Sequence, residues 1–144
     1  MTSKEKIIEF QLDPVKREIE KPSILVVDDS PSILKSINYA LKEKYKVYAL
    51  TSPEETVNLL KRIEPDLFLL DYKMPGLTGF DLIPIIRKIP RYNKSPIIIM
   101  TSEGTVDNMS IADGLGACDF IVKPIDIELL HKKIATHLTS HMAK

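Results

Sequence analysis

Residues 23–29 read SILVVDD, an uninterrupted apolar run that ends in two carboxylates. Other β-rich runs follow it and alternate with stretches of helical periodicity; they cover Lys46 to Leu50, Leu67 to Leu70, Pro96 to Met100 and Phe120 to Val122. Such alternation predicts a parallel sheet. Because several runs are apolar throughout, we expect central strands that helices cover on both faces.

The segments between these strands carry apolar residues at helical spacing. Five helices are expected; they are marked by Ile33, Ile37 and Leu41, by Thr56, Leu59, Leu60 and Ile63, by residues 82–89, by residues 106–115, and by Ile127, Leu130, Ile134 and Leu138. Pro84 in the third pattern predicts a missing hydrogen bond, and therefore a bend or a late helix start. Gly114 and Gly116 should close the fourth helix. The sequence thus predicts a doubly wound α/β fold.

The size and charge of the chain limit what it can be. Its 144 residues, 44% of them apolar, suffice for one domain with a substantial core. The 20 Lys and Arg balance the 20 Asp and Glu, which argues against direct binding to nucleic acid or to an anionic membrane. A single cysteine, Cys118, and the lack of a long apolar segment or leader predict a cytoplasmic protein.

Residues 1–22 differ in composition from the rest of the chain, with ten charged side chains and no glycine. We interpret them as a charged N-terminal extension or linker, and residues 23–144 as the single domain. The structure of the extension stays open. Ile8, Phe10 and Leu12 alternate with polar residues as in a strand, whereas Ile7 and Ile8 could begin a helical stripe.

Polar side chains collect where the predicted strands end. Parallel sheets bind ligands at the carboxyl ends of their strands, and these positions hold Asp28, Asp29, Asp71, Thr101, Ser102, Lys123 and Pro124. Carboxylates gathered there repel by about 4 kcal/mol per close pair at an effective dielectric near 20. A cation is therefore needed among them. Mg2+, which takes oxygen ligands and retains waters, is the predicted cofactor.

Each of these residues also has an ordinary structural explanation. Asp28 and Asp29 could cap the helix near Pro31, Asp71 could begin a turn, and Lys123 could be a solvated surface residue. Their convergence instead favours a carboxylate that attacks phosphorus while cations neutralise the transferring oxygens, with Asp71 as the nucleophile. The added charge would rearrange nearby loops, which fits a switch better than an enzyme that turns over substrate.

Four segments carry a family resemblance; they are ILVVDD at 24–29, LLDYKMPG at 69–76, IIMTS at 98–102 and GACDFIVKP at 116–124. In this order the sequence closely resembles the response-regulator receiver family of two-component signalling, the CheY-like domains. The resemblance covers Ser23 to about Leu138. It implies a flavodoxin-like (βα)5 sandwich with a five-stranded parallel sheet in the order 2-1-3-4-5, and a cis bond between Lys123 and Pro124.

The resemblance also implies the roles of the site residues. Asp71 would accept a phosphoryl group from a phosphohistidine of a sensor histidine kinase or a histidine phosphotransfer protein. Thr101 and Lys123 would contact that group. The expected Mg2+ ligands are Asp29, Asp71, the backbone carbonyl of Lys73, and Asp28 through a water.

A switch and an output surface are implied as well. Thr101 and Phe120 form the expected switch pair across the fourth and fifth strands, although Phe120 lacks the hydroxyl of the more usual tyrosine. Its outward exposure should therefore be less favourable for binding polar partners. The fourth helix, fifth strand and fifth helix would bind a downstream protein target or a second receiver; this surface includes Asp107, Asn108, Phe120 and Ile127.

Lys73 and Glu103 occupy positions that tune the lifetime of the acyl phosphate in this family. We expect a salt bridge across the site mouth that impedes the hydrolytic water, and therefore slow self-dephosphorylation. The same residues taken as an exposed pair would contribute little. The main alternative function is an unphosphorylated receiver-like scaffold for protein interaction.

Three other interpretations fail on local features of the sequence. A haloacid-dehalogenase-like phosphatase needs a second acid two residues after the first, but Asp29 is followed by Ser30 and Pro31. A P-loop needs a glycine-rich phosphate loop, but the stretch after the first strand contains no glycine. A flavin site would use hydroxyls and amides rather than carboxylates.

His137 and His141 share one helical face but lack a third ligand nearby, so we expect a solvated helix and assign them no role.

Overall fold

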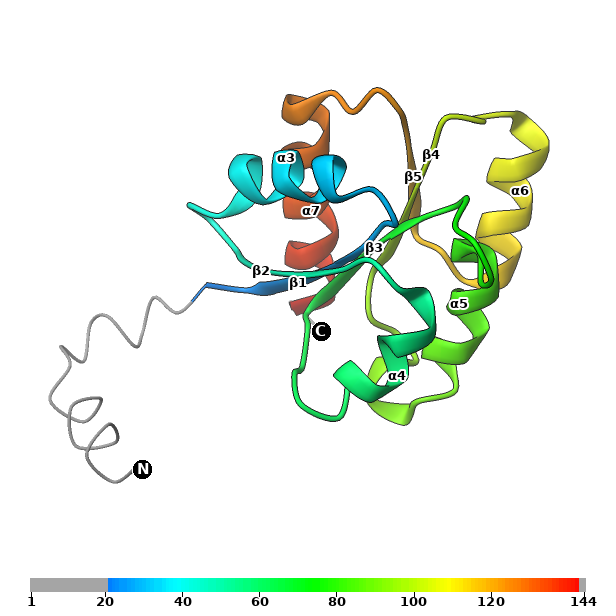
Figure 1. The fold of residues 1–144 in the computed structure, drawn as a ribbon, viewed down its shortest axis with the longest axis horizontal. Helices are drawn as coiled ribbons and strands as arrows, with labels where there is room; N and C mark the ends of the chain where they lie inside the picture. The colour runs from blue at the N-terminus through cyan, green and yellow to red at the C-terminus, as the bar shows by residue number, and fades with distance from the viewer. Residues whose placement is uncertain (1–20, 143–144) are drawn as a thin grey trace, which may run out of the picture.

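The computed structural model describes residues 21–142, and these form a three-layer α/β sandwich (Figure 1). The elements are β1 (Ser23–Val27), α3 (Pro31–Leu41), β2 (Lys46–Leu50), η1 (Pro53–Glu55), α4 (Thr56–Leu59), β3 (Leu67–Asp71), α5 (Gly79–Arg87), η2 (Pro90–Tyr92), β4 (Ile97–Thr101), α6 (Val106–Leu115), β5 (Asp119–Val122) and α7 (Ile127–Met142). All strand pairs are parallel, in the order β2-β1-β3-β4-β5. The predicted fold class and strand order are confirmed.

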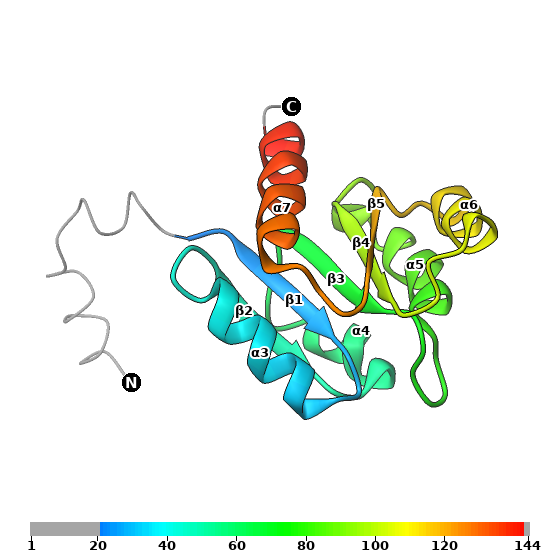
Figure 2. The ribbon, with the colours of Figure 1, turned by 90° about the horizontal axis from the view of Figure 1, so that it is seen from above.

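Helices cover both faces of the sheet, with α3 and α7 on one side and α4, α5 and α6 on the other (Figure 2). Alternate residues of a strand point to opposite faces. Ile24 and Val26 of β1 therefore belong to the core on the side of α3 and α7, while Leu25 and Val27 belong to the core on the opposite side, which includes the buried residues of α5. The fully buried runs of β1, β3 and β4 follow from this double cover.

The third helix begins earlier than Pro84 led us to expect. Thr78 and Asp81 form a capping box, in which each side chain accepts a hydrogen bond from the other residue's backbone N–H. This cap starts α5 at Gly79, which rules out the late start. Pro84 lies inside the helix, so the alternative of a bend stays a prediction. Gly79 has no room for a side chain, because a Cβ there would lie 2.4 Å from the carbonyl oxygen of Asp71.

Other helix ends follow local chemistry. Ser30, rather than Asp28 or Asp29, caps α3 by accepting from the backbone N–H of Ile33, and Pro31 takes the first helical position. The second helix is shorter than expected, since α4 ends at Leu59. Gly116 closes α6 at a left-handed φ of 113°, as predicted. The same prediction for Gly114 is wrong, because Gly114 lies inside the helix.

The bond between Lys123 and Pro124 is cis, which confirms that expectation. The expectations for the extension fall on residues 1–20, outside the described part of the chain, so the domain boundary near residue 22 stays a prediction. Over residues 21–142, no helix combines the length and the hydrophobicity needed to cross a membrane.

Candidate functional site

Three carboxylates meet at the carboxyl edge of the sheet. Asp28 and Asp29 follow β1, Asp71 ends β3, and the two strands pair in parallel with Val27 beside Leu70. One oxygen from each carboxylate lies within 4.8 Å of the others. Asp28 and Asp71 are buried and Asp29 is exposed. The topology therefore brings the predicted acids together at one open edge.

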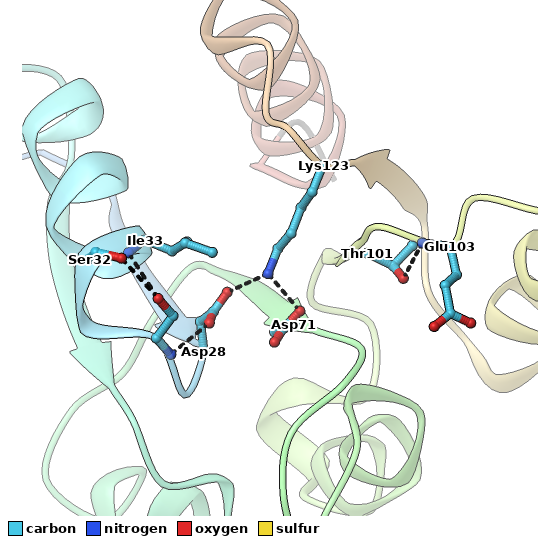
Figure 3. Close-up of polar contacts among 8 residues, drawn as sticks. Asp28, Ser32, Ile33, Asp71, Thr101, Glu103 and Lys123 are labelled. Atoms are coloured by element: carbon cyan, nitrogen blue, oxygen red, sulfur yellow. Dashed lines mark hydrogen bonds and ion pairs between the residues drawn. The ribbon is translucent and has the colours of Figure 1, made fainter.

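Lys123, which follows β5, reaches into this acidic cluster (Figure 3). Its Nζ lies 2.9 Å from Oδ2 of Asp28 and 2.9 Å from Oδ1 of Asp71. Burial acts to lower the pKa of Lys123, but the hydrogen bonds and the charges of the two carboxylates together outweigh burial and raise that pKa. The ammonium is thus held in its charged form between two buried acids.

Asp71 remains short of positive charge despite Lys123. Burial raises the pKa of its carboxyl, the neighbouring Asp28 and Asp29 raise it further, and Lys123 offsets only part of this. The Lys123 ammonium bonds to Asp28 and Asp71, while Asp29 adds a third carboxylate close by. Close oxygen donors with an excess of negative charge fit a hard divalent cation, so the residues present suit Mg2+.

Thr101 ends β4 and is buried beside the site. Its Oγ1 accepts a hydrogen bond of 2.9 Å from the backbone N–H of Glu103. Because this bond uses a lone pair, the hydroxyl proton stays available to an anionic oxygen. The Glu103 carboxylate forms the expected ion pair with Lys73 Nζ, and both side chains are exposed.

Phe120 lies differently from our expectation. It pairs in register with Ile99, whereas Thr101 pairs with Val122, so Phe120 and Thr101 are not direct cross-strand neighbours. Phe120 is 8% exposed and packs in the core with α5 and α6, because an apolar side chain gains from burial there. It is therefore not part of the accessible surface that Asp107 and Ile127 help to form.

His137 is not simply solvated, as the sequence led us to expect. Its Nε2 lies 2.8 Å from Oδ2 of Asp119, the first residue of β5, and Lys133 Nζ lies 2.7 Å from Oδ1 of the same carboxylate. These bonds tie α7 to the amino end of β5. Lys133 and His137 are four apart on one helix face, but that spacing alone does not indicate what they face.

A second contact missed from the sequence involves Asn108, expected only as a surface residue. Its Nδ2 donates a hydrogen bond of 2.9 Å to the backbone carbonyl of Glu103. The side chain of Asn108 thus holds the loop between β4 and α6, next to Thr101.

Comparison with known proteins agrees with this geometry. Residues 24–135 match the model of the response regulator receiver domain. The chain is 31% identical over 127 residues to a probable cyclic di-GMP phosphodiesterase of Vibrio cholerae (88% of this chain, 29% of the relative) and 33% identical over 116 residues to the transcriptional regulatory protein AfsQ1 of Streptomyces coelicolor (78% and 49%). The chain thus spans half or less of the length of these relatives.

Solved structures show the same architecture. The chemotaxis protein CheY4 of Vibrio cholerae superposes with a TM-score of 0.78 at 27% identity, over 81% of this chain and 98% of that one. A CheY-like receiver domain protein of Methanospirillum hungatei gives a TM-score of 0.79 at 26% identity, over 86% and 98%. With the family model matching most of its length, the chain belongs to the response-regulator receiver family of two-component signalling.

Proposed function

We propose that this domain accepts a phosphoryl group on Asp71 from a phosphohistidine of a sensor histidine kinase or a histidine phosphotransfer protein. The observation that carries the proposal is the position of Lys123, with Nζ 2.9 Å from the buried carboxylates of both Asp28 and Asp71. A lysine held there can donate hydrogen bonds to the oxygens of a phosphoryl group once that group is attached to Asp71. The burial of Asp71 beside two further acids supports the need for additional positive charge.

Oxygens of Asp28, Asp29 and Asp71, together with the backbone carbonyl of Lys73, would hold Mg2+ in this site, with Asp28 acting through a water. When bound, Mg2+ neutralises charge on the transferring oxygens. The oxygen-only donor set and its close spacing support this assignment.

The chain's own residues perform the transfer. A deprotonated Asp71 oxygen attacks phosphorus, the bond between phosphorus and the donor imidazole nitrogen breaks, and its electron pair stays on that nitrogen. Lys123 Nζ and the Thr101 hydroxyl then donate hydrogen bonds to the phosphoryl oxygens. We expect the ion pair of Lys73 and Glu103 to impede the water that hydrolyses the product, which makes self-dephosphorylation slow.

The proposed output is a changed surface formed by α6, β5 and α7, which binds a downstream protein or a second receiver. Val106, Met109, Val122 and Ile127 are exposed there, at 40 to 80% of their area. Exposed apolar groups support a protein partner, and the balanced charge argues against direct binding to nucleic acid or membrane. A cytoplasmic location is part of this proposal.

Intact mass spectrometry after incubation with Mg2+ and acetyl phosphate tests the proposal. We expect the gain of one phosphoryl group, which EDTA prevents and Asp71→Asn abolishes. Asp113→Asn removes an exposed carboxylate on α6 and serves as the matched control that keeps the gain. If folded wild-type protein gains no mass under any of these conditions, an unphosphorylated interaction scaffold becomes the better account.

A further inference from the structure

Helix α6 is held to the domain by little apolar packing. It lies wholly within the described part of the chain, and Ala112 is its one buried residue. Val106 is 80% exposed, and Met109, Ile111 and Leu115 are exposed as well. Helices in proteins are stabilised mainly by packing of an apolar face. The position of α6 therefore depends strongly on hydrogen bonds at its two ends.

The two ends are fixed by different residues. At the carboxyl end, Arg87 donates a hydrogen bond of 2.6 Å to the carbonyl of Gly116. At the amino end, Thr105 Oγ1 accepts from the backbone N–H of Asn108 at 3.1 Å, and Asn108 Nδ2 donates to the Glu103 carbonyl at 2.9 Å. The Asn108 side chain thus connects the first turn of α6 to the loop that precedes it.

That loop meets the candidate site at two points, both through Glu103. Its backbone N–H donates to Thr101 Oγ1, which leaves the Thr101 proton free for an anionic oxygen. Its carboxylate pairs with Lys73 across the site mouth. A single amide, that of Asn108, therefore restrains both contacts and links them to α6.

The geometry points to Asn108 as a positioning residue of the phosphorylation switch. The Asn108 side chain holds Glu103 in place. The Thr101 hydroxyl then faces the phosphoryl group, and the Glu103 carboxylate shields the phosphoryl group from water. Through the same bond, movement of this loop reaches α6. This inference rests on the proposed function of Asp71. The competing account is an ordinary loop contact that contributes to stability alone.

The test measures the half-life of phosphorylated Asp71 by intact mass after removal of acetyl phosphate, in the presence of Mg2+. Asn108→Asp has nearly the same shape but cannot donate, and an acid in the first turn suits the helix dipole, so folding should be preserved. We expect a half-life shorter by roughly three- to tenfold, the factor that corresponds to one ordinary hydrogen bond. Asn108→Ala should act similarly, and Asn108→Gln, which keeps a donor, should restore part of the half-life.

Ser110→Ala, at an exposed position of the same helix, is the control and should leave the half-life unchanged. A positioning role also predicts non-additivity. In a Glu103→Ala background the shielding carboxylate is gone but the backbone contact with Thr101 remains, so Asn108→Asp should shorten the half-life by a smaller factor than it does in the wild type.

An unchanged half-life in Asn108→Asp, or an undiminished effect in the Glu103→Ala background, would overturn the role of Asn108. These outcomes are distinct from failure of the proposed function. Absence of phosphoryl uptake in the wild type rejects that function and this inference together, whereas normal uptake with an unchanged half-life rejects only the inference.

Discussion

Two polar clusters at opposite edges of the sheet both pair aspartate with lysine, but in different proportions. At the carboxyl edge, Lys123 bridges Asp28 and Asp71 while Asp29 lies close by. At the amino end of β5, a single carboxylate, that of Asp119, receives hydrogen bonds from Lys133, His137 and the Phe120 backbone N–H. The first cluster has more acids than donors, and the second has more donors than acids.

The pKa directions express this difference. Burial raises the pKa of Asp71, and Lys123 offsets only part of that rise. Burial also acts to raise the pKa of Asp119, but the hydrogen bonds from Lys133, His137 and Phe120 outweigh burial and lower that pKa. The Asp119 carboxylate has enough hydrogen-bond donors and ties α7 to β5. The Asp71 carboxylate has too few, and so it can still bind a cation and accept a phosphoryl group.

The largest expected effect is on phosphoryl uptake, which should depend on the first cluster and not on the second. Asp71→Asn should abolish phosphoryl uptake from acetyl phosphate, because the amide lacks the attacking oxygen. Asp119→Asn should leave the rate of uptake unchanged in folded protein. Intact mass measured over time checks both, and loss of uptake in Asp119→Asn would remove the functional distinction between the clusters.

The next effect concerns the two lysines. Lys123→Met removes the ammonium between two buried acids and should lower the free energy of unfolding by about 3–5 kcal/mol, since it leaves buried charges uncompensated. Lys133→Met leaves His137 and the Phe120 N–H on Asp119 and should cost less, about 1–2 kcal/mol. Urea unfolding at pH 7 without Mg2+ measures both, and equal losses would contradict the comparison.

The acids themselves should change stability in opposite directions. The raised pKa of Asp71 means that its buried charge costs stability at neutral pH, a cost that disappears as pH falls through its folded pKa. The lowered pKa of Asp119 means that its contribution is present above its unfolded pKa of about 3.9 and is lost as pH falls through its folded pKa.

At pH 7, therefore, Asp71→Asn should raise the midpoint of thermal unfolding and Asp119→Asn should lower it. The difference between wild type and Asp119→Asn should shrink once the pH falls below about 4. Melting followed by circular dichroism from pH 3 to 7 provides the measurement. Destabilisation by Asp71→Asn at pH 7 would show that Lys123 already satisfies that carboxylate.

The smallest effect lies at the exposed mouth of the site. Lys73→Ala should shorten the half-life of phosphorylated Asp71 by about two- to fivefold, because an exposed ion pair shields weakly. Lys94→Ala, at another exposed lysine, is the matched control. A half-life equal to that of the wild type would remove the proposed shielding by Lys73.

Much of this molecule follows from local features of the sequence. Apolar runs predicted the five strands and the burial of the central ones. The rule that parallel sheets bind ligands at the carboxyl ends of their strands grouped Asp28, Asp71, Thr101 and Lys123 before any distance was known. Both inferences succeed because strand direction and sheet order determine which residues share an edge. The positions of these side chains are then set by the positions of the strand ends.

Tertiary structure alone decided the contacts between elements. No periodicity indicates that His137 faces Asp119, that Asn108 reaches the Glu103 carbonyl, or that Phe120 pairs with Ile99 rather than Thr101. A hydrogen bond requires donor and acceptor within about 3.2 Å, so it depends on how each helix is rotated and placed on the sheet. That placement results from packing of the whole core, which the spacing of residues along one element does not specify.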